Sequence, residues 1–338
     1  MGVCVDRKFL HRFRWVDCQL DGLRRCKTKN QLLETLKSLP KTLDGTYLRI
    51  LQNIPEESQG HARRALWWLV EARRPLTVEE VAEAAVLDPS IEIPFDPEER
   101  FFDPHDDIIE ILGSLVSIVR VGIETEPSTP VSVGGITVST ITSLSDQLRL
   151  SHFSVKEYLI SDRISQAADL AVRGFYASQQ LADRFILKGC LEYIFHYSES
   201  EDKVGNDEDL EQYPLLRYAC EYWCMHADAS VIDKDVEEAL VRFLASDTVL
   251  NAWLLVYTPE QPRKKYFDQP DEPGQALHYA ARFGLVTVAR RLLEDSIDAN
   301  VKTESGITPL HLASEVRTGP DLTGPFTAPK NLIPGIPC

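Results

Sequence analysis

The sequence predicts a mainly α-helical chain that contains several small domains. Three observations lead to this fold class. Apolar residues recur at helical spacing along most of the 338 residues, β-branched segments gather between residues 115 and 150, and a four-residue word near the C-terminus returns after 33 residues, from 277 to 310. At about 100 to 200 residues per domain, the length favours two or three domains.

Composition and charge narrow the possible functions. Apolar residues make up 43% and charged residues 26%, as in an average soluble protein. The 36 Lys and Arg against 52 Asp and Glu give a formal charge of −16, which argues against a nucleic-acid partner because phosphate contacts need Lys and Arg. Seven cysteines without a C-x-x-C pair, and no apolar run typical of a signal peptide or a membrane span, predict a cytoplasmic chain without a membrane partner.

Two helical regions are predicted before the first strand. Residues 1–38 carry apolar side chains at helical spacing among many Arg and Lys, and we interpret them as helices whose packing partners are missing. Residues 39–165 begin with four helices, bounded by prolines and, in one case, by a capping box of Thr77 with Glu80. These helices are predicted near 41–54, 59–72, 78–86 and 104–112.

The hydrophobic period changes after the last of these helices. Segments of β-branched or alternating residues predict three strands, at 115–121, 136–141 and 148–150. Three helices followed by a small sheet is the plan of a winged helix, so we assign a winged-helix domain to residues 39–165. A capping box of Ser154 with Glu157 predicts a helix over 155–164 that leaves the sheet.

No strand signal follows, and residues 166–262 are predicted to form an α-helical connector. Its helices are expected at 177–195, 215–227 and 236–244. The acidic run 199–211 is most simply a solvated loop between the first two.

The repeated word is Leu277-His278-Tyr279-Ala280, which returns as Leu310-His311-Leu312-Ala313 after Thr308-Pro309. Its period and the pattern Thr-Pro-Leu-His-x-Ala are those of ankyrin repeats. In that design the Pro opens a helix, the Leu enters the core, the His hydrogen-bonds the turn and the Ala permits close helix packing. We predict one complete and one partial repeat over 270–316, followed by a disordered Pro- and Gly-rich tail at 317–338. The residues with these structural roles are Leu277, His278, Ala280, Thr308, Pro309, Leu310, His311 and Ala313.

Several short sequence motifs resemble those of a known family. They are Phe13-Arg14-Trp15-Val16, Leu39-Pro40-Lys41-Thr42, Arg74-Pro75-Leu76-Thr77, Leu150-Ser151-His152-Phe153-Ser154-Val155-Lys156-Glu157-Tyr158-Leu159 and Pro214-Leu215-Leu216-Arg217-Tyr218-Ala219. In this order they resemble the C-terminal portion of fungal NACHT-ankyrin proteins, which are similar to NOD-like receptors of the signal-transducing NTPase class. The resemblance implies that residues 1–38 are the last helices of a NACHT module, followed by the winged helix, the connector and the ankyrin array.

The resemblance also implies a regulatory role. In such proteins the NACHT module switches and oligomerises, the winged helix holds the switch, and the ankyrin array binds a protein partner. This sequence contains no Gly-Lys dipeptide, so it offers no Walker A loop onto which the NTPase residues could be carried. We therefore expect a non-enzymatic interaction and regulatory fragment that binds no nucleotide or other cofactor. The alternative is a truncated remnant of a nucleotide-dependent signalling NTPase.

A weaker alternative is a winged helix that binds nucleic acid. Its third helix would have to present basic and amide side chains to DNA. That segment instead carries Asp103, Asp106, Asp107 and Glu110, with no Lys or Arg between residues 101 and 112. We expect duplex DNA to repel it.

Two residue groups could suggest catalysis or metal binding. His152 and Ser154 invite comparison with a Ser/His pair, but a G-x-S-x-G elbow is absent and a helix cap explains Ser154. Cys220, Cys224 and His226 have no fourth ligand at a plausible spacing, so core packing is the better interpretation. The sequence thus predicts no catalytic residue and no metal site.

Overall fold

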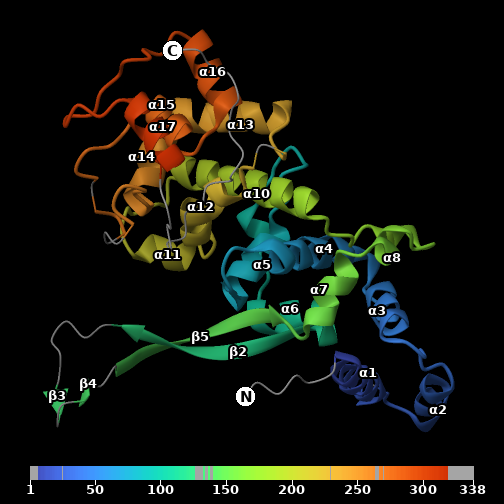
Figure 1. Ribbon diagram of the computed structural model, residues 1–338. Coiled ribbons are helices and arrows are strands. Elements are labelled where there is room, and N and C mark those ends of the chain that lie inside the picture. Colours follow the sequence, from blue (N-terminus) through green and yellow to red (C-terminus); the bar gives the residue numbers. More distant parts are fainter. Residues whose placement is uncertain are drawn as a thin grey trace. The chain divides into compact units, whose positions relative to one another are not determined.

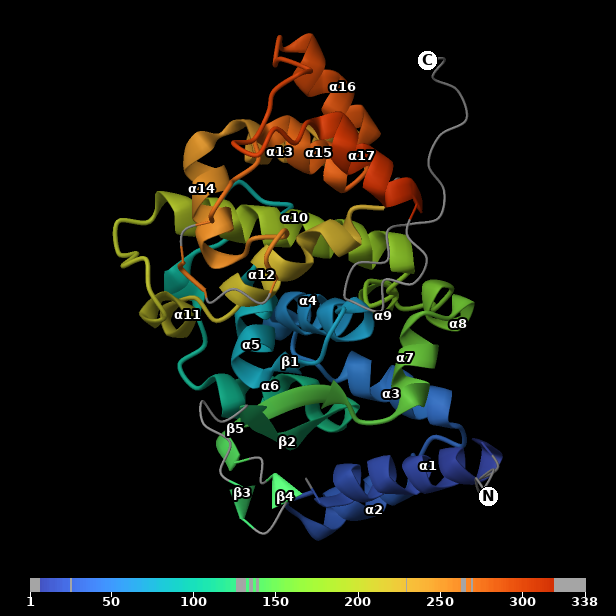
Figure 2. The same cartoon turned by 60° about the vertical axis from the view of Figure 1, so that its left-hand side comes forward.

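The computed structural model describes residues 7–24, 26–125, 132–133, 136–137, 140–228, 230–262, 266–268 and 270–318. The chain folds into two compact units (Figures 1 and 2). Unit 1 consists of Met1–Val86 and Glu99–Ser178, and unit 2 of Leu87–Glu98 and Gln179–Cys338. Most described residues are helical, with one small three-stranded sheet, so the predicted mainly α fold class is confirmed.

Helices dominate unit 1. Their bounds are α1 Arg7–Arg24, α2 Lys29–Lys37, α3 Leu43–Gln52, α4 Glu56–Glu71, α5 Val78–Val86, α6 Pro104–Leu112, α7 Phe153–Leu159, α8 Asp162–Ser165 and α9 Leu170–Arg173, with short 3-10 turns η1 Pro97–Glu99 and η2 Gly113–Leu115. Helices α4, α5 and α6 pack against one another. Ala62, Ala65 and Leu66 of α4 are fully buried at the i, i+3, i+4 spacing of an amphipathic helix.

Local capping signals place the helix starts of unit 1. The predicted capping box is present at α5, where Thr77 N donates to Glu80 at 2.8 Å and Glu80 N donates to the Thr77 hydroxyl at 3.2 Å. The Arg74 guanidinium also binds the buried Glu80 carboxylate at 2.6 and 2.7 Å. Asp103 caps α6 by accepting a hydrogen bond from Asp106 N, and Pro104 opens that helix.

The sheet of unit 1 has the antiparallel order β1-β5-β2. Its strands are β1 Leu76–Thr77, β2 Val116–Thr125 and β5 Thr140–Leu150, and a separate hairpin pairs β3 Ser132–Val133 with β4 Ile136–Thr137. The strands predicted at 136–141 and 148–150 were wrong in their bounds, because β5 runs without a break from residue 140. Cross-strand pairing explains this, since Arg120 lies opposite Asp146 and donates to its carboxylate at 2.7 Å.

The helix that follows the sheet begins earlier than predicted. The capping box of Ser154 with Glu157 was wrong, because His152 caps α7 by accepting a hydrogen bond from Ser154 N at 3.2 Å. Ser154 lies inside the helix, is buried, and its hydroxyl bonds to the Tyr47 hydroxyl at 2.8 Å. The helix also ends at Leu159, and α8 follows as a separate turn.

Unit 2 is helical throughout its described part. Its helices are α10 Gln179–Glu199, α11 Glu208–Gln212, α12 Leu216–Tyr222, α13 Lys234–Ala245, α14 Asp247–Val256, α15 Ala276–Arg282, α16 Val286–Glu294 and α17 Pro309–Thr318, with the 3-10 turn η3 Trp223–His226. The predicted helix 215–227 is therefore α12 followed by η3. Trp223, Phe243 and Trp253 form the aromatic centre of this unit, with ring centroids 5.2 to 5.7 Å apart.

Two predictions concern the chain ends and the membrane. Helix α17 includes residues 317–318, and the rest of the tail predicted to be disordered, 319–338, lies outside the described residues. Among the described residues no single helix is long and apolar enough to span a membrane; α13 and α14 pass that test only together, across an 81° bend.

Candidate protein-interaction site

The first ankyrin helix, α15, is held by the imidazole of His278. Its Nδ1 accepts a hydrogen bond from Gln275 N at 3.1 Å, and its Nε2 lies 3.0 Å from the carbonyl oxygen of Ile307. An imidazole that accepts at Nδ1 and donates at Nε2 is the neutral tautomer. The side chain is fully buried, so His278 joins the start of one repeat to the turn that precedes the next.

The second copy of the word repeats the local geometry. His311 Nδ1 lies 3.1 Å from Thr308 N, which donates to it, and 2.9 Å from the Thr308 hydroxyl. Pro309 is buried and opens α17. His311 itself is exposed, so the same residue type makes the same turn contact in two different surroundings.

The leucines of the two words differ in burial. Leu277 is buried and Ala280 is fully buried, as the ankyrin design requires. Leu310 is 77% exposed, so the expectation that it enters the core was wrong. In a repeat stack each repeat covers the apolar face of the one before it. Helix α17 supplies that cover for α15 through buried Leu312, whereas no described element covers Leu310.

Aromatic side chains anchor the repeat to the connector helices. The Trp253 ring lies 5.0 Å from that of Tyr279, and the Trp223 ring lies 5.2 Å from that of Phe283. The Trp253 indole also donates to the carbonyl of Cys220 at 2.9 Å. Helices α15 and α16 additionally pack against α13. The repeat therefore shares one core with the connector.

The turn between the repeats is exposed but ordered by hydrogen bonds. Thr303 N donates to Ile307 O at 3.0 Å, and Gly306 has a φ of +84° that favours glycine. Ser305 N donates to the Glu272 carboxylate at 3.0 Å, across the 33-residue repeat. A partner would thus meet a preformed surface of turn tips.

The structure does not bring Cys220, Cys224 and His226, for which the sequence favours core packing over metal binding, together as a metal site. His226 is fully buried, its Nδ1 lies 2.7 Å from Asp183 Oδ1, and its Nε2 lies 2.9 Å from the Tyr218 hydroxyl. Within the part of the chain that the structure describes, no group of three His, Cys, Asp or Glu could hold a metal. Burial raises the pKa of the Cys220 thiol and raises that of Cys224 to about 12. These groups are therefore built into the core as protonated or hydrogen-bonded side chains.

A polar network in unit 1, which the sequence did not predict, involves the words that carry the resemblance. Arg14 is buried on α1 and donates to the Ser151 hydroxyl at 2.5 Å and to the carbonyl of Ser114. The His152 Nδ1 lies 2.6 Å from the Ser154 hydroxyl, which also bonds to Tyr47. Burial, opposed by its hydrogen bonds, raises the pKa of Tyr47. This geometry gives Ser154 two partners in a fixed corner, where it supports packing.

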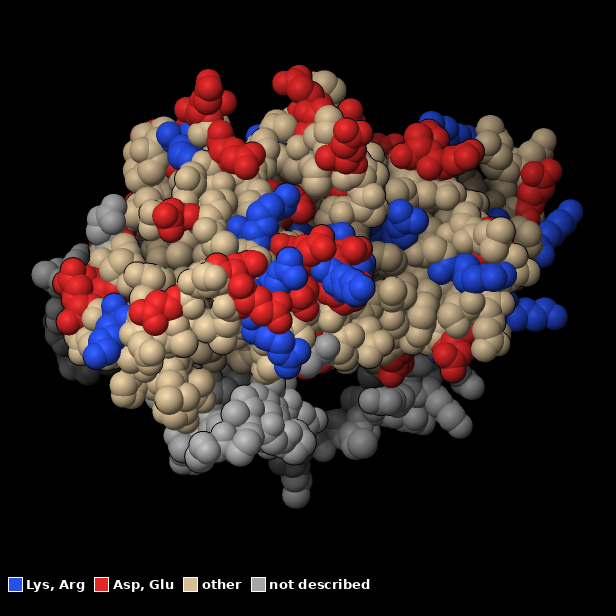
Figure 3. Space-filling model, turned by 90° about the horizontal axis from the view of Figure 1, so that it is seen from above, with Lys and Arg blue, Asp and Glu red and all other residues tan. Residues whose placement is uncertain are grey.

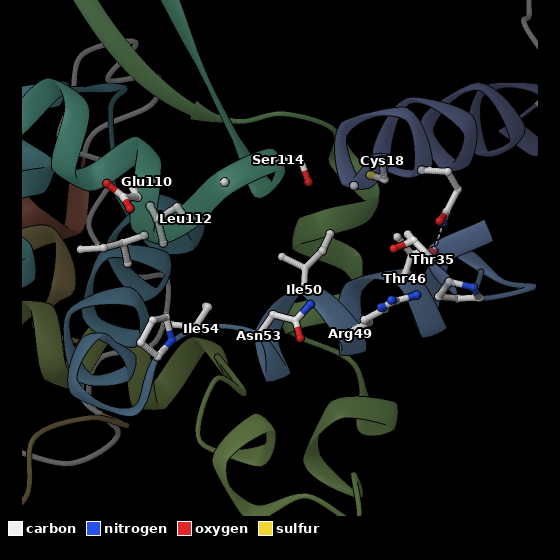
Figure 4. A pocket seen from close by; sticks show the side chains of 16 residues that line it. Cys18, Thr35, Thr46, Arg49, Ile50, Asn53, Ile54, Glu110, Leu112 and Ser114 are labelled. Carbon is white, nitrogen blue, oxygen red and sulfur yellow. Dashed lines mark hydrogen bonds between the residues drawn. The ribbon is translucent and has the colours of Figure 1, made fainter. Parts of the chain in front are cut away.

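A cavity of about 300 Å³ lies beside that corner, between α1, α3 and α6 (Figure 4). Ile50, Ile54 and Leu112 supply apolar surface, Arg49 lines it from α3, and Asn53 lines it from the position that follows this helix. The Arg49 guanidinium is held by the carbonyl of Ser38 at 2.9 Å. The cavity thus lies where the first two helices meet the rest of unit 1.

Comparison with known proteins gives two kinds of match. The ankyrin repeat model matches residues 276–304. The azaphilone pigments biosynthesis cluster protein L of Monascus ruber is 31% identical over 299 residues, which is 86% of this chain and 58% of that protein. The chain therefore spans a little over half the length of this relative. The neurogenic locus notch homolog protein 1 of Xenopus laevis and that of Homo sapiens are 53% and 51% identical over 47 residues, 14% of this chain and 2% of each of those proteins. No solved structure matches.

Proposed function

We propose that this chain is a non-enzymatic, cytoplasmic protein-interaction and regulatory fragment, similar to the C-terminal part of NACHT-ankyrin receptor-like proteins. The observation that carries the proposal is the ankyrin repeat, whose helices share a core with the connector while its turn tips are exposed. A rigid support and an exposed, preformed turn suit recognition of a protein partner.

The order of elements in unit 1 supports a winged helix as the regulatory module. Helices α4, α5 and α6 and strands β1, β2 and β5 follow the chain order α4-β1-α5-α6-β2-β5, and β5 lies between the other two strands. Arg14 fastens α1 to the corner where the sheet leads into α7. In the proposed function, α1 belongs to the segment whose movement the winged helix controls.

The similarity to the Monascus ruber protein supports a shared architecture over most of the chain. Its name refers to a pigment biosynthesis cluster and gives no activity to carry over. We propose that this chain binds neither ATP nor GTP, because its sequence lacks the Gly-rich loop and Lys that cradle phosphates. Calorimetric titration with Mg-nucleotide tests this, and a saturable micromolar site would contradict it.

We further propose that the winged helix packs against protein and does not read DNA. Asp106 and Glu110 are exposed on α6, the helix that would have to enter the major groove. Figure 3, which views the molecule from above, shows basic side chains interspersed with acidic ones on that face, while the exposed acids of α6 argue against DNA binding. Specific affinity for duplex DNA at physiological salt would contradict this part of the proposal.

Site-specific photocrosslinking tests the interaction role. A benzophenone side chain would replace exposed Glu304 at the turn between the repeats, and a matched variant would carry it at exposed Glu238 on α13. We expect one discrete crosslinked partner from a lysate of the source cells at position 304 and none at 238. Equal labelling at both positions, or no partner at either, would contradict the proposal.

A further inference from the structure

Helix α2 contributes no buried side chain to the core of unit 1. None of its nine residues is buried, yet a complete capping box of Thr28 and Gln31 defines its start, with two hydrogen bonds of 3.2 Å. Figure 1 shows it projecting from unit 1 beyond α1 and α3. Within unit 1 its main contact is with α1, and helices this short depend on such packing to be stable in water. Its exposed side chains therefore decide what it can bind.

Those side chains make a basic, apolar face. Leu32, Leu33 and Leu36 are 37%, 44% and 45% exposed, and their i, i+1, i+4 spacing places them on one side of the helix. Lys29 and Lys37 stand at the two ends of the same helix and are exposed. The complementary surface would be apolar in the middle and acidic at its rim.

Unit 2 carries a surface of that description, here called the acidic strip, formed by residues 87–98 and 199–208. Buried Phe95 fixes the first segment, with its ring 5.1 Å from Tyr193 and 4.9 Å from His196. Ile91 and Ile93 then stand out from it, 58% and 64% exposed.

The second segment of the acidic strip is fixed by Asp209. Its fully buried carboxylate accepts hydrogen bonds from the Tyr197 hydroxyl at 2.7 Å and from Val204 N and Gly205 N at 2.8 Å. Val204 is thereby presented 60% exposed. Tyr213 links the two segments, because its ring contacts those of Tyr193 and His196. The exposed acids of the strip are Glu92, Asp96, Glu98, Glu199, Glu201, Asp202, Asp207 and Glu208.

We propose that the chain self-associates head to tail, with α2 of one copy docked on the acidic strip of another. In this contact the three exposed leucines of α2 pack on Ile91, Ile93 and Val204 of the other copy. Lys29 and Lys37 then lie against the exposed acids of its acidic strip. Charge selects this occupant over an antiparallel pair of α2 helices, which would set Lys29 against Lys37 of the other copy. Because the two surfaces differ, the contact is heterologous and builds rings or open chains.

Sedimentation velocity of the full chain over a concentration series tests the proposal. We expect reversible association that the double variant Lys29→Glu/Lys37→Glu weakens at least about tenfold, as reversal of interfacial charges does. Leu33→Ser should weaken it as well. Lys234→Glu/Lys302→Glu, an equal charge change at two exposed sites in unit 2, serves as the control and should leave association unchanged.

Charge exchange makes the test specific. Mixing Lys29→Glu/Lys37→Glu with the variant Glu201→Lys/Asp202→Lys should restore association between the two variants, although each variant alone associates at least about tenfold more weakly than the wild-type chain. A monomer at every concentration, association insensitive to these reversals, or failure of the mixture to associate would each overturn the proposal. Binding of the wild-type chain to phosphatidylserine vesicles through Lys29 and Lys37 would also overturn it, in favour of a lipid surface.

Discussion

The imidazole of His278 contacts the carbonyl of Ile307 at 3.0 Å, so a buried side chain of the first ankyrin repeat holds the turn that starts the second. The neighbouring Glu272 reaches Ser305 N across the same pair of repeats. Stability of a repeat stack depends on such neighbour contacts as much as on each repeat. The contact therefore determines how ordered the proposed interaction surface is.

Replacing this imidazole should destabilise unit 2. His278→Ala removes both hydrogen bonds and leaves Gln275 N without its imidazole partner, so we expect the free energy of unfolding to fall by about 1 to 3 kcal/mol. Urea titration followed by the fluorescence of Trp223 and Trp253 measures it. His311→Ala removes the equivalent turn contact at an exposed position and should cost less than about 1 kcal/mol. Equal losses in the two variants would contradict the assigned role.

Arg14 should hold α1 against the rest of unit 1. Arg14→Ala deletes charged hydrogen bonds to Ser151 and Ser114 at a buried site, and we expect a loss of about 2 to 3 kcal/mol. Hydrogen exchange should show α1 amides losing protection before those of α4. Arg24→Ala, at the exposed end of the same helix, should change stability by no more than about 0.5 kcal/mol. Unchanged protection of the α1 amides in Arg14→Ala would argue against this role of Arg14.

Two buried thiols should react slowly, and three raised thiol pKa values should make the fold sensitive to alkali. Burial raises the pKa of Cys190 and Cys220, and desolvation raises that of the partly exposed Cys224 to about 12, so these thiols stay protonated when the chain is folded. Mass spectrometry after iodoacetamide treatment at pH 8 should find Cys26, which is partly exposed, alkylated well before the buried Cys190 and Cys220.

The raised pKa values of these thiols determine whether the stability of the fold rises or falls with pH. A thiol whose pKa is raised on folding stabilises the fold below its ordinary pKa of 9.0, and that contribution is lost as the pH rises toward about 12. Chemical unfolding at pH 8 and pH 10.5 should therefore show lower stability at the higher pH. A Cys224→Ala variant that keeps the full wild-type slope would contradict a contribution from this thiol.

Local signals in the sequence predicted the elements that local interactions build. Thr77 with Glu80 marks the start of α5, and Gly284, with a φ of +66°, follows the end of α15 in the left-handed conformation that glycine favours. Contacts between distant positions left no such signal. Arg14 meets Ser151 across 137 residues and His226 meets Asp183 across 43, and neither spacing has a pattern to read. Ser154 was misassigned as a cap for the same reason, because its partner Tyr47 lies in a different helix.

Leu277 and Leu310 occupy the same place in the repeated motif, but truncating them should affect the free energy of unfolding very differently. Leu277 is 4% exposed and Leu310 is 77% exposed, because α17 covers the first repeat and no described element covers the second. Leu277→Ala should therefore cost about 2 to 5 kcal/mol through a cavity, whereas Leu310→Ala should lie within about 0.5 kcal/mol of wild type. Limited trypsin digestion provides an independent measurement, since destabilising the repeat should speed cleavage after Lys302 in the exposed turn. We expect faster cleavage in Leu277→Ala and an unchanged rate in Leu310→Ala. If Leu310→Ala were the more damaging change, Leu310 would be packed in solution and the end of the array would be covered by another part of the protein.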